Sequence, residues 1–468
     1  MKFMKFGKAL LISALAAGVA LSITSCVKSY ATGYLYVTGN VTASSSTTSD
    51  GIITGFVVDH NTGKLNPIDG LPISSGGANP VRAVLLSGSR FLYVLNRGVN
   101  SSGGSDCTTA DPCQNANITE FAVGGNGILT AQETFYTQGL NPFRMIGDST
   151  GSYIYVLDHD APDSFAVTGT APTLKTPNSC FEALGTATPS CGDITAFLVN
   201  QTTGRLSLVV NQAASANNPT TLPYFPVPQN PIDFVLSSSY VLTVSGTPTT
   251  GDSVFPYSYS SGNGQLSINQ NSSQPLTNAG NSNGLVDNAT AIVNGTGYVY
   301  VLDNEPITYT PSGSTSPTVS PSQVLPYTVG TGGSLQAQTG GIVPDDPTLS
   351  NPIYLLVEAK GKFLYVANQG NNTAGTNSES GLAGYVIDPS THQLSFIPGE
   401  PFGSGSSPQC MVEDPSDQFI YEANFNDSSV TGRVVDPNSG VLNNMVGSSG
   451  VFALQGPATW CLMDGRTN

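Results

Sequence analysis

Short segments in which apolar and aromatic residues alternate with others recur along the whole chain. One type is rich in tyrosine and usually runs into Asn or Asp; its copies are Tyr34–Val37, Phe91–Val94, Tyr153–Val156, Tyr298–Val301, Phe363–Val366 and Phe419–Glu422, with Tyr240–Thr243 as a degenerate copy. A period of two residues is typical of a β-strand with one buried face. The sequence therefore predicts the same strand seven times.

Three further strands accompany each tyrosine-rich one. The next strand has an aromatic residue at its centre, except for Arg433 in the last copy, and it leads through a polar, usually Gly-containing turn to a short strand that begins at Leu. Glycine accepts the positive φ of such tight reversals. Another strand opens with proline, which is tolerated at the first residue of a strand; these prolines are Pro80, Pro142, Pro231, Pro352, Pro408 and Pro457.

Four strands repeated seven times predict an all-β fold, a seven-bladed β-propeller of four-stranded antiparallel blades. We name the strands A (opened by proline), B (tyrosine-rich), C and D, from the channel outward. The chain begins with strand B at Tyr34 and ends on strand A, Pro457–Met463. We expect this C-terminal strand to join the N-terminal blade, so that residues 33–468 form one closed ring without an unpaired inner edge.

Composition supports this architecture and restricts the partners. Charged residues make up only 10% of the 468 residues, whereas hydrophobic residues, at 39%, are sufficient for a core. The net charge of −16 repels phosphate backbones, so we expect no nucleic-acid partner.

The first residues predict export. Lys2, Lys5 and Lys8 precede an apolar run of a length typical of a signal peptide, and the run ends Ile23-Thr24-Ser25-Cys26. This ending resembles the bacterial lipobox, which implies a signal peptide over 1–25, lipidation of Cys26 and a linker over 26–32. Because Val27 is not Asp, the sorting pattern favours the outer membrane, on its periplasmic or surface side. An ordinary signal peptide with a chance cysteine is the alternative.

The six other cysteines suit three disulfides in an oxidising compartment. Cys107 and Cys113 bracket one short loop, and Cys180 and Cys191 bracket another. Strand A of the last full blade carries Cys410, and the closing strand beside it carries Cys461, so a bond between them would tie the ring shut. A zinc site is the alternative, but no CxxC pair is present, and we expect no metal and no cofactor.

The repeats also carry a resemblance. Segments such as Leu35-Tyr-Val-Thr-Gly-Asn40 and turns such as Asp59-His-Asn-Thr-Gly-Lys-Leu65 resemble the YVTN-type seven-bladed propellers, in particular the lactonase family with its 6-phosphogluconolactonase-like and carboxymuconate-cyclase-like members. The resemblance spans about residues 33–465. It implies a hydrolase that opens lactone rings. Such enzymes have a histidine near the start of some A strands, whereas here no A strand carries one.

The strand order places B–C and D–A connections on one face, which we call the top face. The long insertions lie nearly all there, which favours a binding site on that face, although neutral expansion is the alternative; they are 97–116, 159–192, 305–321 and 369–380 between B and C, and 211–229 and 267–288 between D and A.

Polar residues that start strand A or end strand B could converge at the top mouth of the channel. Arg82, Arg144 and Asp233 lie two residues after the strand-A proline, where other blades have Tyr354, Cys410 and Thr459. Arginine pairs bind carboxylate or phosphate through forked hydrogen bonds. Strand B is followed by Arg97 in one blade, and ends Asp158-His159-Asp160 in another.

We predict catalytic roles for His159, as general base, and for Arg82 and Arg144, as groups that hold a developing oxyanion. Arg97, Asp158, Asp233 and Tyr354 are the predicted ligand-binding residues. Structural roles, such as turn capping by Asp or Asn and pairing of arginine with a neighbouring acid, are the alternative for these residues.

The resulting expectation is a lipid-anchored, lactonase-like propeller of the cell envelope that binds a small anionic or sugar-like ligand and hydrolyses a lactone. Its only membrane contact would be the lipid, and a cell-envelope protein is a possible partner. The alternative function is a non-catalytic scaffold, or a module that binds carbohydrate or protein.

Overall fold

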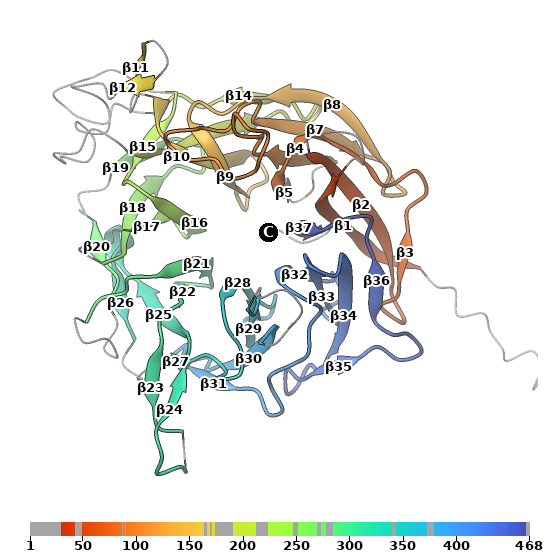
Figure 1. Ribbon diagram of the computed structural model, residues 1–468, viewed down its shortest axis with the longest axis vertical. Coiled ribbons are helices and arrows are strands. Elements are labelled where there is room, and N and C mark those ends of the chain that lie inside the picture. Colours follow the sequence, from red (N-terminus) through yellow and green to blue (C-terminus); the bar gives the residue numbers. More distant parts are fainter. Residues whose placement is uncertain are drawn as a thin grey trace, which may run out of the picture.

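The structure is a computed structural model that describes residues 30–42, 49–86, 88, 90–162, 166–168, 171–173, 191–211, 223–246, 251–268, 273–277, 284–311, 313–338, 343–371 and 379–464. Within these ranges, seven large antiparallel sheets surround a central axis like the blades of a propeller (Figure 1). The predicted fold class is confirmed.

Each blade contains strands A to D in the predicted spatial order. Blade 1 consists of β37 (Ala458–Met463), β1 (Ala31–Thr42), β2 (Ser49–Asp59) and β3 (Leu65–Pro67). Blade 2 consists of β5 (Pro80–Leu85), β6 (Phe91–Asn96), β7 (Asn117–Val123) and β8 (Leu129–Phe135). Blade 3 consists of β9 (Leu140–Gly147), β10 (Tyr153–Asp160), β13 (Gly192–Val199) and β14 (Leu206–Leu208).

The other four blades repeat this arrangement. Blade 4 consists of β16 (Pro231–Ser237), β17 (Tyr240–Ser245), β18 (Ser253–Tyr259) and β19 (Leu266–Ile268). Blade 5 consists of β21 (Ala289–Asn294), β22 (Tyr298–Asp303), β25 (Gln323–Val329) and β26 (Leu335–Ala337). Blade 6 consists of β28 (Pro352–Val357), β29 (Phe363–Asn368), β30 (Gly381–Ile387) and β31 (Leu394–Phe396), and blade 7 of β32 (Pro408–Glu413), β33 (Phe419–Asn424), β34 (Ser429–Val435) and β35 (Leu442–Asn444).

The outer strand departs from the prediction. In five blades it is split, because a second short segment pairs with the other end of strand C; these segments are β4 (Ile73–Ala78), β15 (Phe225–Val227), β20 (Gln274–Pro275), β27 (Val343–Pro344) and β36 (Val451–Ala453). The predicted insertions 211–229 and 267–288 therefore contain strand. Two insertions between B and C form small hairpins, β11–β12 (Ala166–Thr168, Ala171–Thr173) and β23–β24 (Ile307–Tyr309, Thr318–Ser320).

The ring closes as predicted. The C-terminal strand β37 pairs with β1, with Val37 opposite Cys461 and Leu35 opposite Met463. Figure 1 shows β37 beside β1 at the centre of the molecule. The disulfide Cys410–Cys461, with Cα atoms 6.0 Å apart, joins β32 of blade 7 to this closing strand.

The tyrosine and glycine of the repeat meet between blades. In six blades the third residue of the tyrosine-rich segment is a buried tyrosine that donates its hydroxyl to a carbonyl in the C–D turn of the next blade, for example Tyr93 to Gly204 at 2.5 Å and Tyr365 to Gly440 at 2.7 Å. These glycines have φ near +77°, which few other residues adopt readily. The repeated sequence motif is therefore the contact that holds neighbouring blades at a fixed angle.

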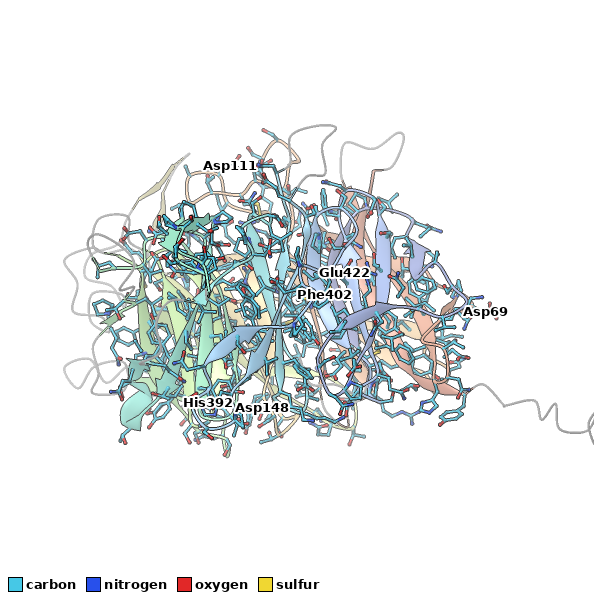
Figure 2. The ribbon with its side chains drawn as sticks, turned by 90° about the horizontal axis from the view of Figure 1, so that it is seen from below. Asp69, Asp111, Asp148, His392, Phe402 and Glu422 are labelled. Atoms are coloured by element: carbon cyan, nitrogen blue, oxygen red, sulfur yellow. A yellow bond between two sulfur atoms is a disulfide. The ribbon has the colours of Figure 1, made fainter. Side chains whose placement is uncertain are left out.

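The two faces also lie as expected. Figure 2 shows Asp111, in the connection between strands B and C of blade 2, on one face. Asp148, in an A–B turn, and His392, in a C–D turn, lie on the opposite face. Candidate site residues at the starts of A strands and the ends of B strands therefore belong to the top face.

Candidate functional site

The inner strands share a β-bulge near their first residue. In blade 2 the pairing register shifts between Pro80 and Arg82, which leaves Val81 as the bulged residue, and the same shift occurs in the other blades. Bulges re-aim side chains at the ends of strands. The position after the bulge therefore lies beside the channel in six of the seven blades, whereas in blade 7 its side chain, that of Cys410, is bonded to Cys461 of the neighbouring blade.

Seven residues occupy this position. They are Arg82, Arg144, Asp233, Ala291, Tyr354, Cys410 and Trp460. The assignment of Thr459 to this place is wrong by one residue. In blade 1, Ala458 rather than Pro457 is the first paired residue, so Trp460 takes the position.

A cavity of about 320 Å³ lies at the top mouth of the channel, on the side of blades 7, 1, 2 and 3. Its wall consists of bulged residues, the residues after them and the residues that follow strand B: Val81, Arg82, Arg97, Phe143, Arg144, His159, Gln409, Phe425 and Thr459. The structure thus brings together the three predicted catalytic residues and Arg97. We call this space the outer cavity.

A second, smaller cavity of about 140 Å³ lies along the inner strands, and we call it the inner cavity. Arg82 and Arg144 line both cavities, whereas Asp233, Tyr354 and Trp460 line only the inner one. The two arginines therefore lie at the boundary between the outer cavity and the inner cavity, whose lining is mostly apolar.

Among the described residues no acid forms an ion pair with Arg82, although the charge of Asp233 acts on it from across the inner cavity. Its guanidinium lies 3.9 Å from the centre of the Trp460 ring, and Nη1 donates to the carbonyl of Val81 at 2.6 Å. Burial, and then repulsion by Arg144, lower the pKa of Arg82 well below its usual range. A bound anion would relieve both effects, because it would compensate the desolvated charges.

Arg144 has a fixed partner. Its Nε donates to Asp233 Oδ1 at 3.1 Å, and the Asp233 carboxylate also accepts from the backbone amides of Phe234 and Ile292. Because these amides fix the carboxylate, Asp233 orients the Arg144 side chain. The prediction that Asp233 contacts a ligand directly remains a prediction, as does that for Tyr354, whose ring packs edge-on against Trp460.

Arg97 reaches the outer cavity from the first position after β6. Its Nη2 donates to the carbonyl of Cys107 at 3.5 Å, and no described residue accepts a hydrogen bond from its buried Nε. Burial, and then Arg144, lower the pKa of Arg97. The outer cavity is thus lined by three arginines and by no carboxylate from the described residues.

His159 is the second-last residue of β10, at the position equivalent to Arg97 of blade 2. Its Nδ1 lies 3.2 Å from Asp160 Oδ2. An ionised carboxylate only accepts hydrogen bonds, so this contact requires a proton on Nδ1. The neutral ring then has its lone pair on Nε2, which is the form that can accept a proton from water.

Asp158, a predicted ligand-binding residue, lies elsewhere. Its side chain is fully buried in blade 3, lines neither cavity and accepts a hydrogen bond from Thr137. Burial raises the pKa of Asp158 well above its usual range, and hydrogen bonds from Thr137 and Thr195 oppose this. Its position within the blade follows from strand alternation, which turns consecutive residues of β10 to opposite faces.

Several residues around the site escaped the sequence reasoning. These residues are Phe143, Gln409 and Phe425, which line the outer cavity. Asp160, which the sequence places next to His159, contacts its ring. Register position was the available signal: Phe143 and Gln409 are bulged residues, and Phe425 is the first residue after β33.

The predicted disulfide Cys107–Cys113 is present, with Cα atoms 5.1 Å apart. Cys191 is disulfide-bonded, and its expected partner Cys180 lies outside the described residues, as does Cys26. The described ranges contain no cluster of three or more His, Cys, Asp or Glu side chains suited to a metal ion. They also contain no helix with the length and hydrophobicity of a membrane span.

Fold and site together define the class: a seven-bladed β-propeller with a cationic cavity at one mouth of its channel. Residues 323–453, from β25 to β36, match the family model described as "Lactonase, 7-bladed beta-propeller". The resemblance to lactonase-family propellers is therefore confirmed. No curated protein matches the sequence at a significant level.

Solved structures agree with this fold. A protein of Bacteroides uniformis, proposed to be a 6-phosphogluconolactonase, superposes with a TM-score of 0.60 at 14% identity, over 92% of this chain and 99% of that one. The periplasmic gluconolactonase of Pseudomonas aeruginosa superposes with a TM-score of 0.56 at 16% identity, over 92% and 98%. At such low identities the likeness shows the fold.

Proposed function

We propose that the propeller binds a small anionic organic compound in the outer cavity and hydrolyses a lactone of the sugar-lactone type there. The observation that carries the proposal is that Arg82, Arg97 and Arg144 line one cavity together with His159, and that none of the described residues lining it is an acid. The lactonase family match and the gluconolactonase among the structural neighbours support the choice of reaction.

The chemistry needs three events. His159 Nε2 takes a proton from water as the water oxygen attacks the lactone carbonyl. Guanidinium groups of Arg82 and Arg144 donate hydrogen bonds to the oxyanion of the tetrahedral intermediate. The ring C–O bond then breaks, the protonated His159 returns its proton to the leaving alkoxide, and the product is the hydroxy acid.

The size of the cavity suits this substrate class. A volume of about 320 Å³ is at the lower end of ligand pockets, which span roughly 300–1,000 Å³. Phe143 and Phe425 supply apolar surface at the edge. One small molecule with a negative group toward the arginines is therefore the ligand that we expect.

The test is a panel of sugar, phosphorylated sugar and aromatic lactones, with protein-free samples to subtract spontaneous hydrolysis. We expect Arg144→Ala to lower kcat/KM by about 10²–10³-fold and His159→Ala to lower kcat by about 10²–10⁴-fold. Arg205→Ala is the matched control, because Arg205 is an exposed arginine paired with Glu133 far from the cavity. Activity that is unchanged in both site variants would contradict the proposal.

The alternative, a non-catalytic binding module, is favoured by the lack of a histidine on any inner strand. The fluorescence of the single tryptophan, Trp460, can distinguish the two functions, because the ring lies against Arg82 and should report an anion that binds there. A change in Trp460 fluorescence with gluconate or phosphate, without turnover of any lactone, would identify a binding module.

We also propose that the protein is anchored by lipid on Cys26 in the outer membrane, on the strength of the lipobox-like sequence. Cys26→Ala should move the protein from the membrane fraction to the soluble fraction, because acyl chains would be its only attachment. Equal amounts of wild type and variant in the membrane fraction would contradict this.

A further inference from the structure

The turn that follows strand B is tied differently in blade 3. In blades 2 and 6, the asparagine before strand A donates to a backbone carbonyl two residues after strand B: Asn79 to Gly98 at 2.7 Å, and Asn351 to Gly370 at 2.8 Å. In blade 3 the equivalent residue is Asp160, and Asn141 Nδ2 donates to its carboxylate at 2.8 Å. A side-chain network thus replaces the usual backbone contact.

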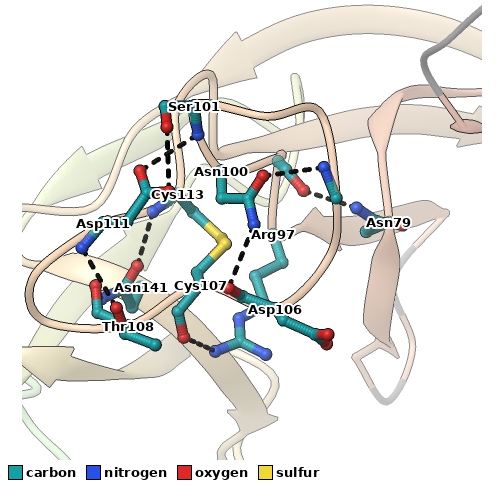
Figure 3. The surroundings of a disulfide bond; sticks show 12 residues. Asn79, Arg97, Asn100, Ser101, Asp106, Cys107, Thr108, Asp111, Cys113 and Asn141 are labelled. Atoms are coloured by element: carbon teal, nitrogen blue, oxygen red, sulfur yellow. Dashed lines mark hydrogen bonds between the residues drawn. A yellow bond between two sulfur atoms is a disulfide. The ribbon is translucent and has the colours of Figure 1, made fainter.

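This network extends to the disulfide-closed loop of blade 2. Thr109 Oγ1 donates to Asp160 Oδ1 at 2.9 Å, and the backbone amide of Cys113 donates to Asn141 Oδ1 at 2.7 Å. Asn141 Nδ2 also donates to the carbonyl of Thr108 at 3.3 Å. Figure 3 shows Asn141 between Cys113 and Thr108, with the disulfide beside them. The loop between Cys107 and Cys113 is therefore fixed on blade 3.

Two cavity residues from two blades depend on this loop. His159 Nδ1 contacts Asp160 Oδ2, the same oxygen that Asn141 binds, and Asp160 is only 5% exposed. Arg97 Nη2 donates to the carbonyl of Cys107 (Figure 3). A carboxylate that is held by Thr109 and Asn141 presents a fixed acceptor, and a fixed acceptor sets both the tautomer and the orientation of an imidazole ring.

We propose that Asp160 and the Cys107–Cys113 loop form one positioning element, which keeps the proton of the neutral His159 ring on Nδ1 and holds Arg97 at the cavity. Asp160 is a positioning residue, because it lines neither cavity and acts through His159. The expected effect of Asp160 on turnover rests on the proposed lactonase function. Its expected effect on the tautomer of the His159 ring does not.

The test is nitrogen NMR of the full-length protein labelled with ¹⁵N-histidine, at alkaline pH, where imidazole is neutral. The chain has three histidines, so the loss of one signal in His159→Gln assigns His159. We expect the Nδ1-H form in wild type. Asp160→Asn should shift the ring toward Nε2-H, because an amide can donate to Nδ1, and should lower kcat about 10–100-fold with little change in KM.

Asp111→Asn is the matched control, since Asp111 lies in the same loop but bonds Ser101. A tautomer that is unchanged in Asp160→Asn, or changed equally in Asp111→Asn, would overturn the proposal. Should Asp160→Asn fail to fold, Thr109→Val removes one support of the carboxylate and should change the His159 signals, while Thr130→Val on exposed β8 should not. If wild type hydrolyses no lactone, the proposed reaction fails, and the ring signals still decide this proposal.

Discussion

Two disulfides border the same cavity in different ways. Cys107–Cys113 closes a short loop above blade 2, and this loop contacts Arg97 and the turn of blade 3. Cys410–Cys461 is buried and joins the inner strands of blades 7 and 1, next to the cavity residues Gln409 and Thr459. The first supports side chains from outside the ring, and the second ties the ring itself.

The same contrast appears at equivalent register positions. Blade 3 has Arg144 after the bulge and His159 near the end of strand B, where blade 7 has Cys410 and Phe425 at the equivalent positions. The backbone register is the same in these two blades, but the side chains differ in use: Arg144 and His159 line the outer cavity, whereas Cys410 is bonded to Cys461. The side of blades 2 and 3 carries the polar chemistry, whereas the side of blades 7 and 1 carries the closure of the ring.

The largest expected effect tests this division. Replacing Cys410 and Cys461 by serine should lower the free energy of unfolding by about 4 kcal/mol, because the bond closes a loop with a sequence separation of 51 residues. Replacing Cys107 and Cys113 should cost about 2 kcal/mol, since their separation is 6 residues. It should nevertheless weaken anion binding in the outer cavity more than the loss of Cys410 and Cys461 does.

Denaturant unfolding without reductant measures the first quantity, and fluorescence titration with gluconate measures the second. Equal losses of stability in the two double variants would contradict the assignment of ring closure to Cys410–Cys461. Weaker anion binding only in the variant without Cys410 and Cys461 would contradict the assignment of the cavity side chains to the Cys107–Cys113 loop.

A smaller effect concerns a charge within blade 7. Glu422 takes the strand-B position that Val156 occupies in blade 3, and burial raises its pKa to about 8. Because the folded-state pKa lies above the unfolded value of about 4.3, the stabilising contribution is complete at low pH and is lost as the pH rises through about 8.

The melting temperature of wild type should therefore fall as the pH rises from 5 to 9. Glu422→Gln should reduce that fall by a few °C, because the amide does not ionise. Asp69→Asn, at an exposed position on the rim of the propeller (Figure 2), is the control and should leave the pH dependence as in wild type. Identical pH dependence of the melting temperature in wild type and Glu422→Gln would show that ionisation of Glu422 does not destabilise the fold.

The fold was accessible from the sequence because its contacts repeat. The tyrosine of strand B and the glycine of the C–D turn recur in the chain since they bond to each other between blades, as Tyr93 and Gly204 do. Closure by β37 followed from the order of strands along the chain. The split outer strands were missed because four of the second segments, such as β20, have only two or three residues, and the longer β4 has no alternation of apolar and polar residues.

The site was accessible only in part. Counting from the proline placed Arg82 and Arg144 at the channel, but a bulge one residue later in blade 1 exchanged Thr459 for Trp460. The aspartates that flank His159 were evident in the sequence, but the hydrogen bonds of Asp160 to Thr109 and Asn141 could not be predicted, because these partners are 51 and 19 residues distant in the sequence. Such contacts depend on how one blade's loop lies over the next.

The start of the propeller lies far from its cavity. Tyr30 stacks on His60 at a ring distance of 4.3 Å, and His60 belongs to a C–D turn, on the face opposite the outer cavity. Only three residues lie between Cys26 and Tyr30, so the four Cα–Cα steps reach at most about 14 Å. With acyl chains on Cys26, the face opposite the top face would lie against the bilayer. The arginines of the outer cavity would then face the aqueous side, where dissolved ligands can reach them.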